Sequence, residues 1–140
     1  MTKLKIATDS SCDLPASIFH DYAIGVVPIN IRFGEEDYLE GVDIDEKIFY
    51  EKIKTNGALP KTSQPSVGQF VSQYLEWAKQ GFDTILSIHV ASTLSGTVNS
   101  AFVAAQEVAD KIKVVPFDTL SGSAAMGFMC VEAAQLAGLG

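Results

Sequence analysis

The sequence is poor in cysteine, in positive charge and in long apolar runs. Its 140 residues hold only two cysteines, Cys12 and Cys130, which form no CxxC pair, so a zinc or iron–sulfur site is not expected. Ten Lys and Arg against seventeen Asp and Glu give a net charge of -7, which disfavours a nucleic acid or an anionic membrane as partner. No apolar run is long enough to cross a membrane, and the polar N-terminus does not resemble a signal peptide. We therefore expect a cytoplasmic protein without stable membrane insertion.

The motifs of cofactor enzymes are also missing. The sequence contains no G-x-G-x-x-G, no G-x-x-x-x-G-K-[ST] and no G-x-S-x-G nucleophile elbow. Asp9, Asp13 and Asp118 follow predicted strands, but a role as helix cap or loop anchor explains each of them more simply than metal binding. His89 is the one candidate for a base acting on Ser95, although a histidine in a strand is more often a core residue. We expect no catalytic residue, no metal and no cofactor.

Hydrophobic patterning predicts a single α/β domain. The hydrophobic fraction of 47% and the charged fraction of 19% are those of a globular chain. Predicted strands alternate with predicted helices, which indicates a three-layer αβα fold with a mainly parallel sheet. Ser66 and Gln69 form a capping box before one helix. The predicted strands are 3–9, 25–33, 82–90 and 112–118, the predicted helices 14–22, 43–56, 67–80, 95–111 and 122–140, and the stretches 34–41 and 57–66 are interpreted as an acidic turn and a break.

Hydroxyl side chains gather in four loops that lead into helices. These loops are residues 8–13, 61–66, 91–96 and 118–123. Three of them follow predicted strands, where ligands of open α/β sheets collect. Helix N-termini and hydroxyls both donate hydrogen bonds to an oxyanion, so the loops suit a carboxylate or a phosphate. Ordinary helix capping explains the same residues equally well, and both readings stay open on these grounds.

Five motifs, taken together, resemble one known family. They are "KIATDSSCDLP", "VVPINIRFGEEDYLEGVDI", "LPKTSQPSVGQF", "ASTLSGTVNSA" and "VVPFDTLSGSAAMG", in this order. The set resembles the DegV family of bacterial fatty-acid-binding proteins over essentially the whole chain. One departure is Ala91, where many members have a serine, so that this position offers only its backbone. The resemblance implies that residues 1–140 form the family's N-terminal α/β domain, and that a second, lipid-covering domain is absent from this chain.

The resemblance also implies a ligand and a partner. The anion would be the carboxylate of a long-chain fatty acid, held by hydroxyls and N–H groups, with Asp9 organising its loop. The chain would carry the acid without chemistry of its own and present it to a separate ATP-dependent fatty acid kinase. An enzyme acting on a small phosphorylated or keto substrate through the same hydroxyl-rich edge is the alternative, and a non-catalytic partner-binding module is a weaker one. The implied carboxylate-binding residues are Thr62, Ser63, Ser95 and Gly96, supported by Ser92 and Ser10.

A fatty acid has a long apolar tail, which needs its own lining. Each buried CH₂ group contributes about 0.8 kcal/mol, so the tail would supply most of the affinity and the hydroxyls would orient the head group. Apolar residues at helix and strand periods are more often plain core, and that remains the alternative for each candidate. The candidates for the tail lining are Ile29, Phe33, Phe70, Phe102, Met126 and Phe128.

Overall fold

A computed structural model describes residues 2–57 and 59–138; residues 139 and 140, which end the last predicted helix, lie outside the described residues. Its main part, which we call the body, is built on a parallel sheet with the strand order β2-β1-β6-β7. Chain crossovers through helices are what allow parallel neighbours. The strands are β1 Leu4–Asp9, β2 Gly25–Val27, β6 Thr84–His89 and β7 Lys113–Asp118.

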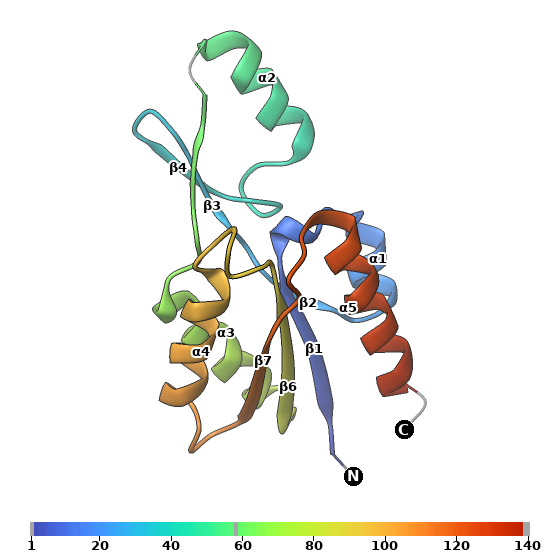
Figure 1. The fold of residues 1–140 in the computed structure, drawn as a ribbon. Helices are drawn as coiled ribbons and strands as arrows, with labels where there is room; N and C mark the ends of the chain where they lie inside the picture. The colour runs from blue at the N-terminus through green and yellow to red at the C-terminus, as the bar shows by residue number, and fades with distance from the viewer. Residues whose placement is uncertain (1, 58, 139–140) are drawn as a thin grey trace.

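Helices cover both faces of this sheet (Figure 1). Neighbouring residues of β1 point to opposite faces, so that Ala7 packs with the first pair of helices and Ile6 with the second. The prediction of a three-layer αβα fold with a mainly parallel sheet is therefore confirmed. The first pair is α3 Val67–Lys79 and α4 Thr97–Glu107; the second is α1 Ala16–Asp21 and α5 Ser123–Gly138.

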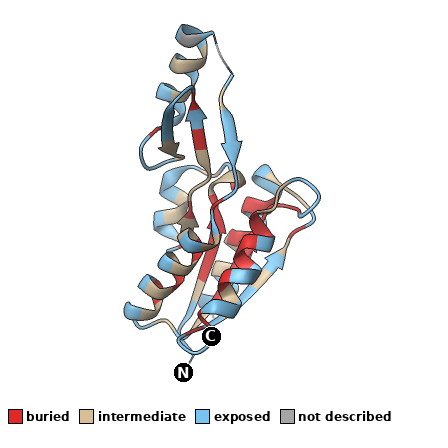
Figure 2. Cartoon of the chain, turned by 90° about the vertical axis from the view of Figure 1, so that its left-hand side faces the viewer, coloured by how far each residue is buried: buried red, intermediate tan, exposed pale blue. Residues whose placement is uncertain are grey.

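The body is tightly packed where β2 meets α3. A Cβ atom at Gly25 would lie 2.3 Å from the Trp77 ring, so no larger residue fits there without moving that ring. Figure 2 shows that buried residues concentrate in the strands of the body and on the inner faces of its helices. No helix within the described ranges combines the length and the apolarity that a membrane span requires.

A second unit, which we call the arm (residues 30–63), stands beyond the carboxyl ends of the parallel strands (Figure 1). It is a small antiparallel sheet with the order β4-β3-β5, covered by one helix. Among its described residues, the core has three buried apolar side chains, Ile31, Phe33 and Ile44. The elements are β3 Asn30–Phe33, β4 Glu36–Leu39, α2 Glu46–Asn56 and β5 Lys61–Ser63.

The arm corrects three sequence-based interpretations. The run 25–33 is not one strand but two, β2 in the body and β3 in the arm. The acidic stretch 34–41 contains β4, and the break 57–66 contains β5. Acidic residues are uncommon in strands, and β5 is a short polar edge strand whose three residues are all exposed, so neither shows the apolar alternation by which strands are identified.

Candidate functional site

A cavity of about 780 Å³, which we call the hydroxyl cavity, lies where the body meets the arm. The body contributes the turn after β1 and the loop between β6 and α4, as expected for the carboxyl edge of a parallel sheet. The arm contributes β5. The lining residues are Ser11, Asp13, Ile29, Glu40, Thr62, Ser63, Gln64, Val90, Leu94, Ser95 and Gly96.

Four of the six predicted head-group residues share this cavity. Thr62 and Ser63 come from β5, and Ser95 and Gly96 come from the loop before α4. These two motifs are more than thirty residues apart in the sequence, and the fold brings them into one cavity. This convergence is what the predicted anion site requires, and the roles of the four residues stay predictions.

The other two predicted residues, Ser10 and Ser92, lie outside the hydroxyl cavity. The Ser10 hydroxyl donates to Glu40 at 2.5 Å and accepts from the backbone N–H of Ile29 at 2.9 Å. The backbone N–H of Ser92 donates to both carboxylate oxygens of Asp118 at 3.3 Å, which makes Asp118 a loop anchor. Ser10 therefore braces the arm against the body, and Ser92 holds two neighbouring loops together.

Ser95 lines the hydroxyl cavity and also precedes Gly96, the N-cap residue of α4. Its Oγ accepts from the backbone N–H of Thr97 at 3.3 Å and lies 2.8 Å from the Thr97 hydroxyl. Thr97 is the first residue of α4 and is fully buried. The half-buried Ser95 hydroxyl thus contacts the start of α4 and lines the cavity, although it is not the N-cap of that helix.

Gln64 is a lining residue that sequence reasoning missed. Its Nε2 donates to the Ser100 hydroxyl at 3.0 Å, which joins the end of β5 to α4. The side chain crosses directly over Gly96, where a Cβ atom would lie 2.1 Å from the Gln64 Oε1. Any residue with a Cβ atom at position 96 would have to displace the Gln64 amide. An exposed glutamine beside a proline carries no sequence signal for such a contact.

The base of β5 is fixed by amide pairs. Asn30 donates to the Gln64 carbonyl at 3.1 Å, and Asn30 and Gln69 exchange two side-chain hydrogen bonds of 3.0 and 3.2 Å. Gln69 also completes the capping box with Ser66, which confirms that prediction. The T-S-Q-P-S segment is therefore held at both of its ends.

The predicted tail-lining residues are dispersed. Ile29 lines the hydroxyl cavity. Phe33 belongs to the arm core, while Phe70 and Met126 belong to the two body cores. The side chains of two others, Phe102 (47% exposed) and Phe128 (69% exposed), lie on outer helix faces. All six tail-lining residues stay predictions; Ile29 alone lies in the hydroxyl cavity, and the other five have places of core or surface.

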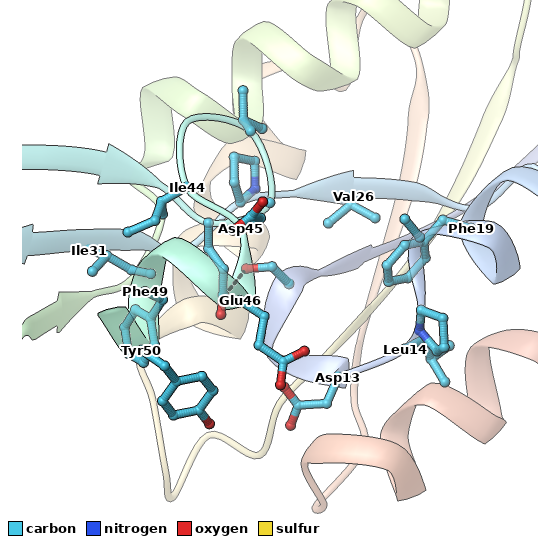
Figure 3. A pocket seen from close by; sticks show the side chains of 17 residues that line it. Asp13, Leu14, Phe19, Val26, Ile31, Ile44, Asp45, Glu46, Phe49 and Tyr50 are labelled. Atoms are coloured by element: carbon cyan, nitrogen blue, oxygen red, sulfur yellow. Dashed lines mark hydrogen bonds between the residues drawn. The ribbon is translucent and has the colours of Figure 1, made fainter. Parts of the chain in front are cut away.

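A second cavity, which we call the apolar cavity, adjoins the first. Its volume is about 740 Å³, and Asp13 and Glu40 line both cavities. Figure 3 shows side chains from the body and from the arm pointing into it. Its apolar lining includes Leu14, Phe19, Val26, Ile31, Ile44, Phe49 and Tyr50, and its other acidic residues are Asp45 and Glu46.

The hydroxyl cavity carries negative charge only. Asp13 and Glu40 line it, and no Lys, Arg or His is among its lining residues. Burial raises the pKa of Glu40 above its usual range, and the charges of Asp13 and Asp9 add to that rise, although the Ser10 hydroxyl opposes it. Glu40 therefore takes up a proton more readily than an ordinary glutamate.

His89 does not reach Ser95. It is fully buried, its Nδ1 lies 2.9 Å from the Asp9 carboxylate and its Nε2 lies 2.7 Å from the Ser87 hydroxyl. Asp, His and Ser in this order have the pattern of a hydrolase triad, but all three are inaccessible to a substrate. The enzymatic alternative needs His89 as a base for Ser95, but both ring nitrogens of His89 are already hydrogen-bonded to Asp9 and Ser87.

Asp9 organises its loop, as the sequence suggested. It accepts from the backbone N–H of Ser11 at 3.0 Å, from the Ser11 hydroxyl, and from the backbone N–H of Val90 at 3.3 Å. Burial alone would raise the pKa of Asp9, but its hydrogen bonds with His89 and Ser11 hold it below its usual range. Asp9 thereby fixes the two body loops that enter the hydroxyl cavity.

The cysteines are structural. Both are buried and free, and burial raises the pKa of Cys12 to about 12, so its thiol stays protonated and unreactive. Within residues 2–57 and 59–138, no three His, Cys, Asp or Glu side chains are grouped as metal ligands.

Comparison with known proteins places the chain in a family. Residues 3–140 match the DegV family of uncharacterised proteins. Protein DegV of Bacillus subtilis is 39% identical over 133 residues, which are 95% of this chain and 47% of that protein. A fatty acid-binding protein of Thermotoga maritima is 39% identical over 128 residues, 89% of this chain and 43% of that protein.

The fold agrees with this result. The crystal structure of DegV, a fatty acid binding protein from Bacillus subtilis, matches with a TM-score of 0.95 at 38% identity, over 100% of this chain and 49% of that one. The chain spans about half the length of the curated relatives that it matches. The match over nearly the full chain shows that this protein belongs to the DegV family.

Proposed function

We propose that this chain binds a long-chain fatty acid and holds its carboxylate in the hydroxyl cavity. The observation that carries the proposal is the convergence of Thr62 and Ser63 from the arm with Ser95 and Gly96 from the body. Hydroxyls and a backbone N–H donate to a carboxylate without adding charge. The fatty-acid-binding relatives from Thermotoga maritima and Bacillus subtilis support this ligand class.

The acyl tail provides the affinity and the cavity orients the head group. Each buried CH₂ contributes about 0.8 kcal/mol, so a chain of palmitate length needs no cation to bind tightly. The first methylenes leave the carboxylate along Ile29, Val90 and Leu94, the apolar side chains of the same cavity. Leu94 is 73% exposed, so this apolar path opens outward.

The carboxylate faces two acidic residues, and one of them reduces the repulsion by accepting a proton. Glu40, whose pKa is raised, is the group suited to this role, whereas Asp13 is exposed and screened by water. A fatty acid would then bind with proton uptake at Glu40. Affinity should fall as the pH rises and Glu40 becomes ionised.

The proposed role is carriage. The chain presents the bound carboxylate to a separate ATP-dependent fatty acid kinase and performs no chemistry itself. The relatives are about twice as long as the part that this chain matches. We propose that a second domain, of the kind the relatives' extra length would hold, covers the hydroxyl cavity. A carboxylate held by neutral donors, without a salt bridge, is held weakly enough at its reacting end to be handed on.

Removing single hydroxyls tests the assignment. In Thr62→Ala and Ser95→Ala, the affinity for palmitate should fall about tenfold, because a hydrogen bond to a charged group contributes about 1.5–3 kcal/mol. Ser92→Ala is the matched control, since Ser92 is an exposed hydroxyl outside the cavity. Titration calorimetry with delipidated protein measures all three. Equal palmitate affinity in the three variants would contradict the proposed site.

A further inference from the structure

Four polar side chains form a continuous buried line behind the hydroxyl cavity. Tyr74 on α3 lies 2.8 Å from the Ser87 hydroxyl, Ser87 lies 2.7 Å from His89 Nε2, and His89 Nδ1 lies 2.9 Å from Asp9. All four residues are 0% exposed. A buried polar line of this length must satisfy every one of its protons.

Counting those protons fixes the state of His89. The Asp9 carboxylate accepts hydrogen bonds from the backbone N–H groups of Ser11 and Val90. Because a carboxylate has no proton to donate, its contact with His89 Nδ1 is a hydrogen bond only if Nδ1 carries the proton. If Nε2 is bare, Ser87 donates to it and Tyr74 donates to Ser87, and every hydroxyl proton has an acceptor.

A proton on His89 Nε2 breaks this arrangement. Nε2 would then donate to the Ser87 hydroxyl, Ser87 would donate to Tyr74, and the Tyr74 proton would have no acceptor within the described part of the chain. The hydrogen-bond directions therefore select the neutral ring with its proton on Nδ1.

We propose that the line Tyr74–Ser87–His89–Asp9 is a positioning network, in which neutral His89 donates from Nδ1 and so aims Asp9 at the two loops of the hydroxyl cavity. Asp9 then fixes the turn that carries Ser11 and the backbone at Val90, five residues before Ser95. His89 acts through Asp9 and does not touch the ligand. The effect on fatty-acid binding rests on the proposed function.

The tautomer is measured on the unchanged protein. With histidine labelled by ¹⁵N, the NMR signals of the ring should show a protonated Nδ1 and a bare Nε2 for His89 at neutral pH. His20, the other histidine of the sequence, has a side chain that is 91% exposed and serves as the internal reference. A His89 ring with Nε2 protonated, alone or together with Nδ1, would overturn the proposal.

Two amide substitutions separate positioning from packing. In His89→Asn the side-chain NH₂ takes the place of Nδ1 and keeps the donor to Asp9, whereas in His89→Gln the amide takes the place of Nε2 and loses it. Palmitate affinity should stay within about threefold of the unchanged protein in His89→Asn and fall about tenfold in His89→Gln. Equal affinities in the two variants would show that His89 is only a packing residue.

Hydrogen exchange at the backbone N–H groups of Ser11 and Val90 supplies a readout that needs no ligand. Both groups should stay protected in His89→Asn and exchange at least tenfold faster in His89→Gln; equal protection would overturn the network. If the unchanged protein binds no palmitate, the proposed function fails, while the ring signals and the exchange rates still decide the network. If neither variant folds, the ring signals of the unchanged protein decide it alone.

Discussion

The body and the arm differ in how much of their structure is buried, and they contribute differently to the site. The body encloses two cores, with Phe70, Tyr74 and Met126 fully buried. The arm, over its described residues, has a core of Ile31, Phe33 and Ile44. Yet both cavities need the arm, because it supplies one wall of each. The body therefore sets the stability of the protein, and the arm completes its binding space.

The small core of the arm also bears on its motion. Local opening costs least where few apolar groups are buried, so the arm should open before the body does. An arm that opens and closes over the hydroxyl cavity provides a route for a long ligand to enter and leave.

The largest effect is expected in the body core. Phe70→Ala removes a fully buried ring that packs against Tyr74 and His89, and it should lower the free energy of unfolding by about 3–5 kcal/mol. Denaturation in urea, followed by circular dichroism, measures the loss. A decrease below 1 kcal/mol would contradict the view that the body sets the stability.

A smaller effect on stability, with a larger effect on binding, is expected in the arm. Phe33→Ala leaves Tyr38 and Phe49 without their edge-to-face partner and should loosen the arm while the body keeps its unfolding midpoint within a few degrees. Palmitate affinity should fall at least tenfold. A single unfolding transition shifted as far as in Phe70→Ala would show that arm and body are one cooperative unit.

The contact between Gln64, just after β5, and α4 comes next in size. Gly96→Ala should displace the Gln64 side chain and break its hydrogen bond to Ser100, at a cost of about 1 kcal/mol in stability and a few-fold in palmitate affinity. Ser100→Ala is the matched control, because it removes the same hydrogen bond without crowding the cavity. Unchanged binding in Gly96→Ala would mean that Gln64 does not shape the site.

The smallest effects are pH-dependent, and their signs are opposite in the two parts. The pKa of Asp9 in the body is lowered, so its stabilising contribution is present above its unfolded pKa and is lost as the pH falls through the folded one. The pKa of Glu40 beside the arm sheet is raised, so the folded protein gains stability as the pH falls through that value. Asp9→Asn should therefore flatten the acid limb of a stability–pH curve, and Glu40→Gln should flatten the part at higher pH. The two substitutions should remove contributions of opposite sign from the stability–pH curve. If both removed contributions of the same sign, the two pKa directions would be contradicted.

The sequence predicts the body better than the arm for physical reasons. The strands of the body are apolar runs bounded by turn residues, and the capping box of Ser66 and Gln69 is visible as a local pattern. β4 begins with the charged pair Glu36 and Asp37, and all three residues of β5 are exposed and polar, so neither segment shows the apolar pattern that predicts a strand.

The site is predictable in the same uneven way. Thr62 and Ser95 stand in recognisable hydroxyl motifs, and the structure puts both in one cavity. The contacts that shape that cavity join residues far apart in the chain. Gln64 meets Ser100 across 36 positions and Asp9 meets His89 across 80, so no local pattern reveals either pair.

A structure of the protein crystallised with palmitate tests the central claim most directly. We expect one carboxylate oxygen of the palmitate to lie within hydrogen-bonding distance of both the Thr62 and the Ser95 hydroxyls. Its first methylenes should lie against Ile29, Val90 and Leu94. A carboxylate bound in the apolar cavity or on the outer faces of α4 and α5, with the hydroxyl cavity left to water, would contradict it.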